Sequence, residues 1–231
     1  MRVLITGTTQ GIGKAIADKF LKEGHYVIGI DRQNQTKEQK ENNNFEFYQL
    51  DVIEKEKFPQ LENIDIIVNN AGSLIEEEAL NNKLMGAYYI TERYAFQPNI
   101  KSVVNISSNS AHFGIEFPLY CMANSAIIGY TKNLAKRLAQ YNATVNSISP
   151  GYVDTTLEKH LKDLELDKEI FKHYLLKHIQ KPQEIANLVY YLTIDNKSIT
   201  GQDILIDCGE SLGSDFVETD ETLERFYKAM L

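Results

Sequence analysis

The sequence predicts one α/β domain: a doubly wound, mainly parallel sheet of seven strands with helices on both faces. Short apolar runs alternate along the chain with segments of helical periodicity, which is the pattern of parallel strands joined by helices. Many of these runs end in small or polar residues, at the sheet edge where such folds bind ligands. The 231 residues contain no internal repeat or linker, so we expect one domain over 1–231, with 212–231 as a C-terminal extension.

Local signals place the elements in order. A strand over 2–6 leads into a glycine-rich turn and a helix from Lys14, which Glu23 and Gly24 cap. Pro98 ends a helix expected over 78–96, and Pro182 starts another that reaches 192. The remaining strands are expected over 26–31, 45–50, 64–68, 101–108, 144–149 and 202–207, and the remaining helices over 119–141 and 157–179.

The turn after the first strand predicts a dinucleotide site. Glycines let the backbone approach a pyrophosphate closely, and the following helix offers free N–H groups and the positive end of its dipole. A glycine-rich turn in this position, between the first strand and the first helix, is a stronger signal than the glycines alone. The residues expected to bind the cofactor here are Gly7, Thr8, Gln10, Gly11, Ile12 and Gly13.

The end of the second strand predicts which dinucleotide binds. Asp31 follows Gly13 by eighteen positions, and a carboxylate there can accept both hydroxyls of the adenosine ribose and repel a 2′-phosphate. Gln10 is uncharged where a basic side chain could hold that phosphate. Arg32 instead favours NADP, because a guanidinium can bind the 2′-phosphate. We therefore expect NAD as the cofactor, with NADP as the less favoured alternative.

Composition excludes several classes of partner. The net charge of −8 argues against nucleic acid and against an anionic membrane surface. No apolar run is long enough to span a membrane, and the N-terminus lacks the features of a signal peptide. The two cysteines, Cys121 and Cys208, lack the spacing of metal ligands, so we expect no metal and a reducing, cytoplasmic location.

Five motifs occur in an order that resembles the short-chain dehydrogenase/reductase family in its single-domain form. They are Thr6-Gly7-x-x-x-Gly11-Ile12-Gly13, Asn69-Asn70-Ala71-Gly72, Asn105-Ile106-Ser107-Ser108, Tyr120 near a helix start, and Pro150-Gly151-x-Val153-x-Thr155. The resemblance implies a Rossmann-type fold, a nicotinamide cofactor, and hydride transfer between that cofactor and a small carbonyl or alcohol substrate. It also implies homodimers or homotetramers formed through the helices at 78–96 and 119–141.

The resemblance assigns further residues to the cofactor. Asp51 and Val52 are expected to flank the adenine, and Asn70, Ala71 and Gly72 the adenosine ribose. At the other end, the segment that begins with Pro150 and Gly151 is expected to bind the nicotinamide, with Val153 and Thr155 holding its carboxamide.

It also assigns the catalytic groups. Tyr120 is expected to be the acid and base and to contact the cofactor, and Ser108 to hydrogen-bond the reacting oxygen, with Ser107 as the alternative serine. His112 lies between Ser108 and Tyr120, where we favour an exposed loop histidine over an auxiliary acid or base.

The chain departs from the family at two matched positions. Asn124 stands four residues after Tyr120, where the family has lysine, and Lys83 stands three residues before Gly86, where the family has asparagine. Residues i and i+4 share a helix face, so Asn124 lies where the ammonium should be.

We therefore expect Lys83 to supply the missing charge from the neighbouring helix, with Asn124 positioning it or a water. Two alternatives remain for these positions: Lys83 is a solvated residue, or a one-residue shift returns Asn82 to the asparagine role. A protein that binds the dinucleotide as a regulator or assembly subunit, without turnover, is the alternative function.

Overall fold

A computed structural model describes the chain except for residues 74, 76–77, 115–116, 156–173 and 213–231. Its centre is one sheet of seven strands in the order β3-β2-β1-β4-β5-β6-β7, with every neighbouring pair parallel. The order reverses between β1 and β4, which is the switch point where doubly wound sheets bind ligands. The strands are β1 (Arg2–Thr6), β2 (Tyr26–Asp31), β3 (Phe45–Gln49), β4 (Ile66–Asn69), β5 (Ser102–Ile106), β6 (Thr144–Pro150) and β7 (Asp203–Ile206). The predicted fold class is confirmed.

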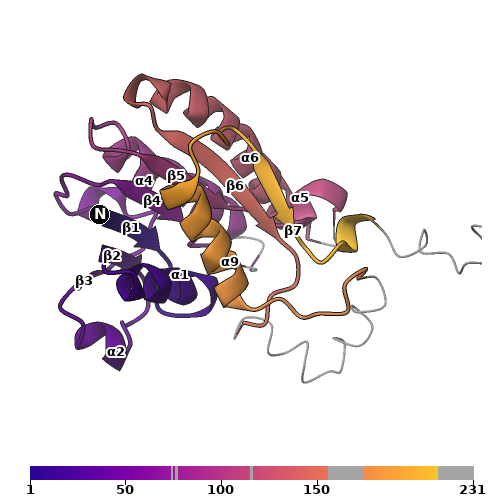
Figure 1. The fold of residues 1–231 in the computed structure, drawn as a ribbon, viewed down its shortest axis with the longest axis horizontal. Coiled ribbons are helices and arrows are strands. Elements are labelled where there is room, and N and C mark those ends of the chain that lie inside the picture. The colour runs from indigo at the N-terminus through magenta and orange to yellow at the C-terminus, as the bar shows by residue number, and fades with distance from the viewer. Residues whose placement is uncertain (74, 76–77, 115–116, 156–173, 213–231) are drawn as a thin grey trace, which may run out of the picture.

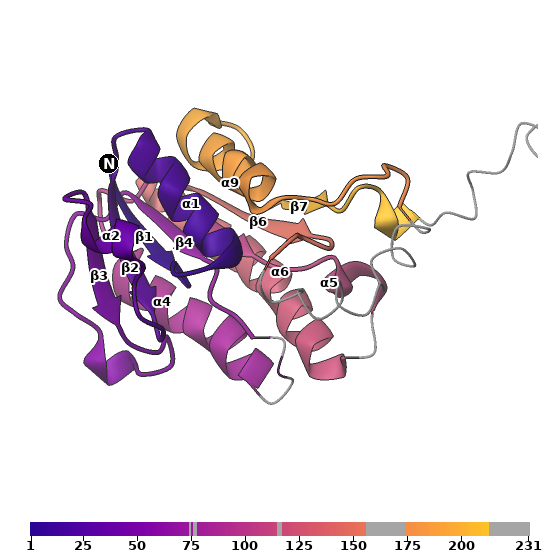
Figure 2. The ribbon, with the colours of Figure 1, turned by 90° about the horizontal axis from the view of Figure 1, so that it is seen from below.

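Helices cover both faces of the sheet (Figure 1). On one face lie α1 (Gly11–Lys22) and α9 (Pro182–Tyr190), which pack against each other. On the other lie α4 (Gly86–Tyr94) and α6 (Pro118–Leu138), which run side by side in Figure 2. The short elements are α2 (Lys37–Lys40), α5 (Ser110–Phe113), η1 (Lys55–Lys57), η2 (Ala79–Met85), η3 (Ala139–Tyr141), η6 (Tyr191–Asp195) and η7 (Glu210–Leu212).

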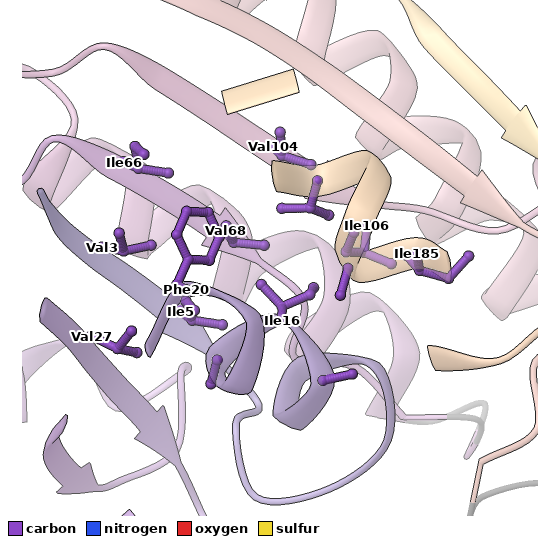
Figure 3. Packing of buried hydrophobic residues seen from close by; sticks show 14 of the residues in the cluster. Val3, Ile5, Ile16, Phe20, Val27, Ile66, Val68, Val104, Ile106 and Ile185 are labelled. Atoms are coloured by element: carbon purple, nitrogen blue, oxygen red, sulfur yellow. The ribbon is translucent and has the colours of Figure 1, made fainter. Parts of the chain in front are cut away.

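Alternation along the strands builds a separate apolar core on each face. Val3 and Ile5 of β1 point toward α1, where they pack with Ile16 and Phe20 (Figure 3). Leu4, between them in the sequence, points the opposite way into the core beneath α4 and α6. Since both faces are covered, the strands read as nearly continuous apolar runs, as parallel strands do.

Several of the expected helices differ from the prediction. The helix expected from Lys14 begins at Gly11, and the helix expected over 119–141 ends as an α-helix at Leu138, where η3 follows. The helix expected over 78–96 begins as the π-helix η2 and continues as α4, ending at Tyr94. The helix expected from Pro182 ends in the π-helix η6. Residues 174–179, the described end of the helix expected over 157–179, are not helical. The remainder of that helix and nearly all of the C-terminal extension lie outside the described residues.

A buried amide network fixes α4 and α6 relative to the sheet. Asn69 at the end of β4 donates through Nδ2 to Thr91 Oγ1 of α4 at 2.9 Å and to Asn105 Oδ1 of β5 at 2.8 Å. Asn105 in turn donates to Thr131 Oγ1 of α6 at 2.9 Å. Hydrogen bonds between buried amides and hydroxyls are specific in geometry, so they set where both helices sit.

Within the described residues, no helix combines the length and the apolar character needed to cross a membrane.

Candidate active site

The glycine turn is shaped for a ligand's phosphates. Gly7 and Gly11 have φ of 75° and 55°, a region that favours glycine. A Cβ on Gly13 would lie 1.9 Å from the carbonyl oxygen of Gly7, so only glycine fits there. Helix α1 begins at Gly11 without a side-chain cap and without an acidic residue in its first turn. Its N-terminal N–H groups and dipole therefore face the turn unopposed by a capping carboxylate.

Asn70 holds this turn against β4. Its Nδ2 donates to the carbonyl oxygens of Thr6 and Gly7 at 3.0 and 3.1 Å. Thr6 Oγ1 accepts from the backbone N–H groups of Asn70 and Ala71, both at 3.0 Å. The resemblance assigned Asn70 to the adenosine ribose, and the structure adds a positioning task that the sequence did not reveal.

A fixed carboxylate lies at the end of β2. Asp31, only 9% exposed, accepts through Oδ2 from Thr9 N–H at 3.0 Å and Thr9 Oγ1 at 2.8 Å, and through Oδ1 from Gln33 N–H at 3.0 Å. These bonds hold the carboxylate beside the glycine turn. Asp51 and Arg32 lie nearby, in the wall of a cavity of about 460 Å³ at the ends of β2 and β3, together with Gln49, Leu50, Ile53 and Glu54. Val52 is buried, is not among the residues that line this cavity, and lies against Gly86.

The segment after β6 approaches the glycine turn from the opposite side. A Cβ built on Gly11 would contact Thr155 Cγ2 at 3.5 Å. Val153 is buried and forms an isolated bridge with Gln180, while Asp154 N–H donates to the Gln180 carbonyl at 2.8 Å. Thr155 therefore lies close to Gly11, beside the start of α1.

Ser108 and Tyr120 come from neighbouring elements at that sheet edge. Ser108 follows β5, is 9% exposed, donates to Asn109 Oδ1 at 3.4 Å and accepts from Ser110 N–H at 3.2 Å. Tyr120 is half-buried in the first turn of α6. The alternative serine, Ser107, donates to the backbone carbonyl of Asn124 at 3.0 Å, so its hydroxyl is engaged in holding α6.

Asn124 is fully buried and only partly satisfied. Its Nδ2 donates to the Tyr120 carbonyl at 2.9 Å, one helical turn back. Its Oδ1 is buried without a hydrogen-bond partner among the described residues. An unpaired buried oxygen costs about 1–3 kcal/mol, so this atom is a natural acceptor for a nearby donor.

Lys83 is buried, which excludes the solvated-residue interpretation. It lies in η2, is 7% exposed, and its Nζ would stand 3.4 Å from a Cβ on Gly72. Burial lowers the pKa of Lys83 from 10.5 to about 8, and no hydrogen bond or ion pair within the described residues offsets that burial. Helix η2 packs against α6, which carries Tyr120 and Asn124. A π-helical turn at this place is typical of functional sites.

Three polar contacts in this region could not be predicted from residue spacing, although the sequence singled out one of the residues involved, His112. Glu78 pairs with Arg32, His112 Nε2 lies 2.7 Å from Asp203 Oδ2, and Glu210 Oε2 accepts from Asn109 Nδ2 at 2.7 Å. His112 is thus directed at β7. Glu210 lies in η7, which Figure 1 places next to α5. Each of these contacts joins residues far apart in the chain, so spacing alone could not have revealed it.

Comparisons with known proteins agree with this geometry. Residues 7–211 match the family model described as enoyl-(acyl carrier protein) reductase. The chain is 30% identical over 242 residues to 3-oxoacyl-(acyl-carrier-protein) reductase of Aquifex aeolicus, a match that covers 89% of this chain and 95% of that protein.

Two solved structures have the same fold over nearly the whole chain. 4-Hydroxyisoleucine dehydrogenase complexed with NADH superposes with a TM-score of 0.83 at 27% identity, covering 92% of this chain and 99% of that one. ElxO with NADP bound superposes with a TM-score of 0.79 at 28% identity, covering 90% and 98%. Similar proteins therefore bind either nicotinamide dinucleotide.

Proposed function

The chain belongs to the short-chain dehydrogenase/reductase family, and from this premise we propose that it is an NAD(H)-dependent oxidoreductase that interconverts a small carbonyl compound and its alcohol. The observation that carries the proposal is Lys83: its ammonium is buried beside Gly72, has no hydrogen bond or ion pair within the described residues, and lies on a helix that packs against the one bearing Tyr120. It supplies a positive charge near the place from which the family's lysine is missing.

The residues at the carboxyl ends of the strands fit the cofactor. The uncapped start of α1 and the glycine turn suit the pyrophosphate, while Asp31 suits the adenosine ribose. We assign Thr155 and Val153 to the nicotinamide end, with the closeness of Thr155 to Gly11 as support. The bound cofactor supplies or accepts the hydride, and the protein has to handle the proton and the charge on oxygen.

Ser108, Tyr120 and Lys83 have separate roles in moving the proton and stabilising the charge on the oxygen. In reduction, Ser108 donates a hydrogen bond to the carbonyl oxygen, which stabilises the negative charge that develops there. Tyr120 then gives its phenolic proton to the same oxygen. Lys83 favours the resulting phenolate through its positive charge, and in the oxidation direction the same charge helps Tyr120 act as a base.

Asn124 has a complementary part in this proposal. Its Oδ1 and the ammonium of Lys83 both lack a partner in the described part of the chain, and they belong to two helices in contact. We assign Asn124 Oδ1 as the acceptor that orients Lys83 through one bridging water. Asn124 would thereby be a positioning residue, and its Nδ2 bond to the Tyr120 carbonyl keeps it in place.

Self-association through α4 and α6 is part of the proposal. Tyr88 on α4 is 41% exposed, although it lies edge-on to Tyr89 and Tyr130, and Met122 on α6 is 58% exposed. Large apolar side chains left open on neighbouring helices suit a symmetric interface. Light scattering should give the mass of a dimer or tetramer, and Tyr88→Glu should shift it toward the monomer.

An exchange experiment tests the catalytic assignment. Lys83→Asn should lower kcat for reduction by NADH at least about a hundredfold, within the range expected for loss of acid–base support. Asn124→Lys alone should also impair turnover, because it brings two ammonium groups together. The double variant K83N/N124K restores the family's arrangement and should recover activity to within about tenfold of the wild type.

Two results would contradict the assignment. If K83N keeps the wild-type kcat, Lys83 has no role in turnover. If the wild type binds NADH but reduces none of a panel of aldehydes, ketones and sugar derivatives, the chain is a dinucleotide-binding regulator or assembly subunit. Lys136→Met, on the exposed side of α6, is the control for the loss of a lysine and should leave kcat unchanged.

A further inference from the structure

An ion pair lies beside the end of β2, next to the cavity that Arg32 lines. Arg32 Nη1 and Glu78 Oε2 are 3.1 Å apart, joining the end of β2 to the start of η2 across 46 residues of sequence. Asn82 Nδ2 also donates to Glu78 Oε2, at 3.2 Å. Glu78 is the residue from which η2 begins, so the helix dipole favours its negative charge. The carboxylate is therefore held in place from two sides.

Arg32 is the group most able to accept a 2′-phosphate. It directly follows Asp31, and it is the one basic residue among those that line the nearby cavity of about 460 Å³. In dinucleotide-binding folds a carboxylate at the end of the second strand binds the ribose hydroxyls, and a nearby arginine accommodates the phosphate of NADP. Asp31 and Arg32 thus favour opposite cofactors.

We propose that Glu78 decides between them: it is a specificity-determining residue that occupies the Arg32 guanidinium and thereby excludes NADP(H). A 2′-phosphate that approached Arg32 would have to displace the Glu78 carboxylate or lie next to it, and both are unfavourable. The acidic neighbours Asp51 and Glu54 in the cavity wall act in the same direction. NAD(H), which carries no charge at this position, is not affected.

The exposure of the Arg32–Glu78 pair is better explained by a role in choosing the cofactor than by a role in stabilising the fold. The side chains of Arg32 and Glu78 are 49% and 37% exposed. Exposed ion pairs contribute only about 0–1 kcal/mol to folding, so the protein does not need this pair to stay folded. Both groups remain accessible to a ligand that enters the cavity.

The inference rests on the proposed function and is tested by binding, without turnover. Dissociation constants for NADH and NADPH would be measured by fluorescence titration for the wild type, E78Q, R32Q and E78Q/R32Q. E78Q should tighten NADPH about tenfold, the effect of one freed charge-assisted contact, and change NADH less than about twofold. R32Q should abolish that gain, so the double variant should bind NADPH no better than R32Q does.

The control removes an equal charge at a distance. Glu41→Gln, on an exposed residue at the end of α2, should leave the ratio of the two constants unchanged. The selector role is overturned if E78Q has the wild-type ratio of dissociation constants for NADH and NADPH, or if it changes both constants equally. It is also overturned if the gain in NADPH affinity persists in E78Q/R32Q. None of these results would contradict the proposed function. Failure of the wild type to bind either nucleotide would overturn both.

Discussion

Lys83 should destabilise the protein in a pH-dependent way. Its pKa falls from 10.5 in the unfolded chain to about 8 in the folded one because burial disfavours the ammonium. The difference corresponds to about 3 kcal/mol. Since the folded state holds this proton less tightly, the full cost is present below about pH 8 and disappears as the pH rises through 10.5. Lys83→Met should therefore raise the free energy of unfolding by about 3 kcal/mol at pH 7, and by only about 1.5 kcal/mol at pH 9.5.

Urea unfolding of the cofactor-free protein at both pH values measures this change. Lys136→Met, on an exposed residue, should shift stability by less than about 0.5 kcal/mol at either pH. The reasoning is refuted if K83M is less stable than the wild type at pH 7. It is equally refuted if the gain is the same at pH 7 and pH 9.5, because a gain from apolar packing alone would not titrate.

Three further predictions concern activity and packing. Turnover should fall as the pH rises through about 8, where Lys83 loses its charge, and this limb should be missing from the pH profile of K83M. Gly13→Ala should abolish NADH binding in a titration, because its Cβ would meet the Gly7 carbonyl. Gly129→Ala has open space around the new Cβ and should stabilise α6 by about 0.5–1 kcal/mol. Asn69→Ala should lower the free energy of unfolding in urea by about 2–3 kcal/mol, because the buried acceptors Thr91 and Asn105 lose their donor. Its control, Asn99→Ala in an exposed amide pair, should change that free energy by less than about 0.5 kcal/mol.

The sheet could be predicted because its signals are local. Apolar runs bounded by glycine, proline and polar residues mark the strands, and the glycine turn marks where a dinucleotide would bind. Strand ends differed by at most two residues from the expected ones. The π-helix η2 could not be predicted, because its hydrogen-bond pattern depends on packing against α6 and not on periodicity. The loss of helix at 174–179 has a similar origin: Tyr174 is fully buried, and its hydroxyl accepts from the Tyr152 backbone.

The residues of the candidate site also fall into those that the sequence could predict and those that it could not. Gly7, Gly13 and Asp31 could be placed from spacing alone, since the turn and the strand end fix where they lie. The burial of Lys83 could not be predicted, because a lysine on a helix is usually solvated and only the tertiary structure shows what covers it. Glu78 was missed for a related reason: its partner lies 46 residues away.

The placement of unsatisfied polar groups supports a role in binding or catalysis for this region. Thr8 Oγ1, Ser110 Oγ and Asn124 Oδ1 are buried without hydrogen-bond partners within the described part of the chain. All three belong to the segments that would surround a cofactor and its substrate: the glycine turn, the start of α5, and the helix of Tyr120. The unpaired ammonium of Lys83 lies in the same region. Buried polar atoms of Arg2, Asn69 and Gln180 also lack partners among the described residues. Folded proteins satisfy nearly all buried polar groups, and exceptions gather where a ligand completes the structure. A surface that served only for packing would have little reason to keep a lysine that costs about 3 kcal/mol. The exchange of lysine and asparagine is therefore better explained as a relocated catalytic charge than as drift in an inactive chain.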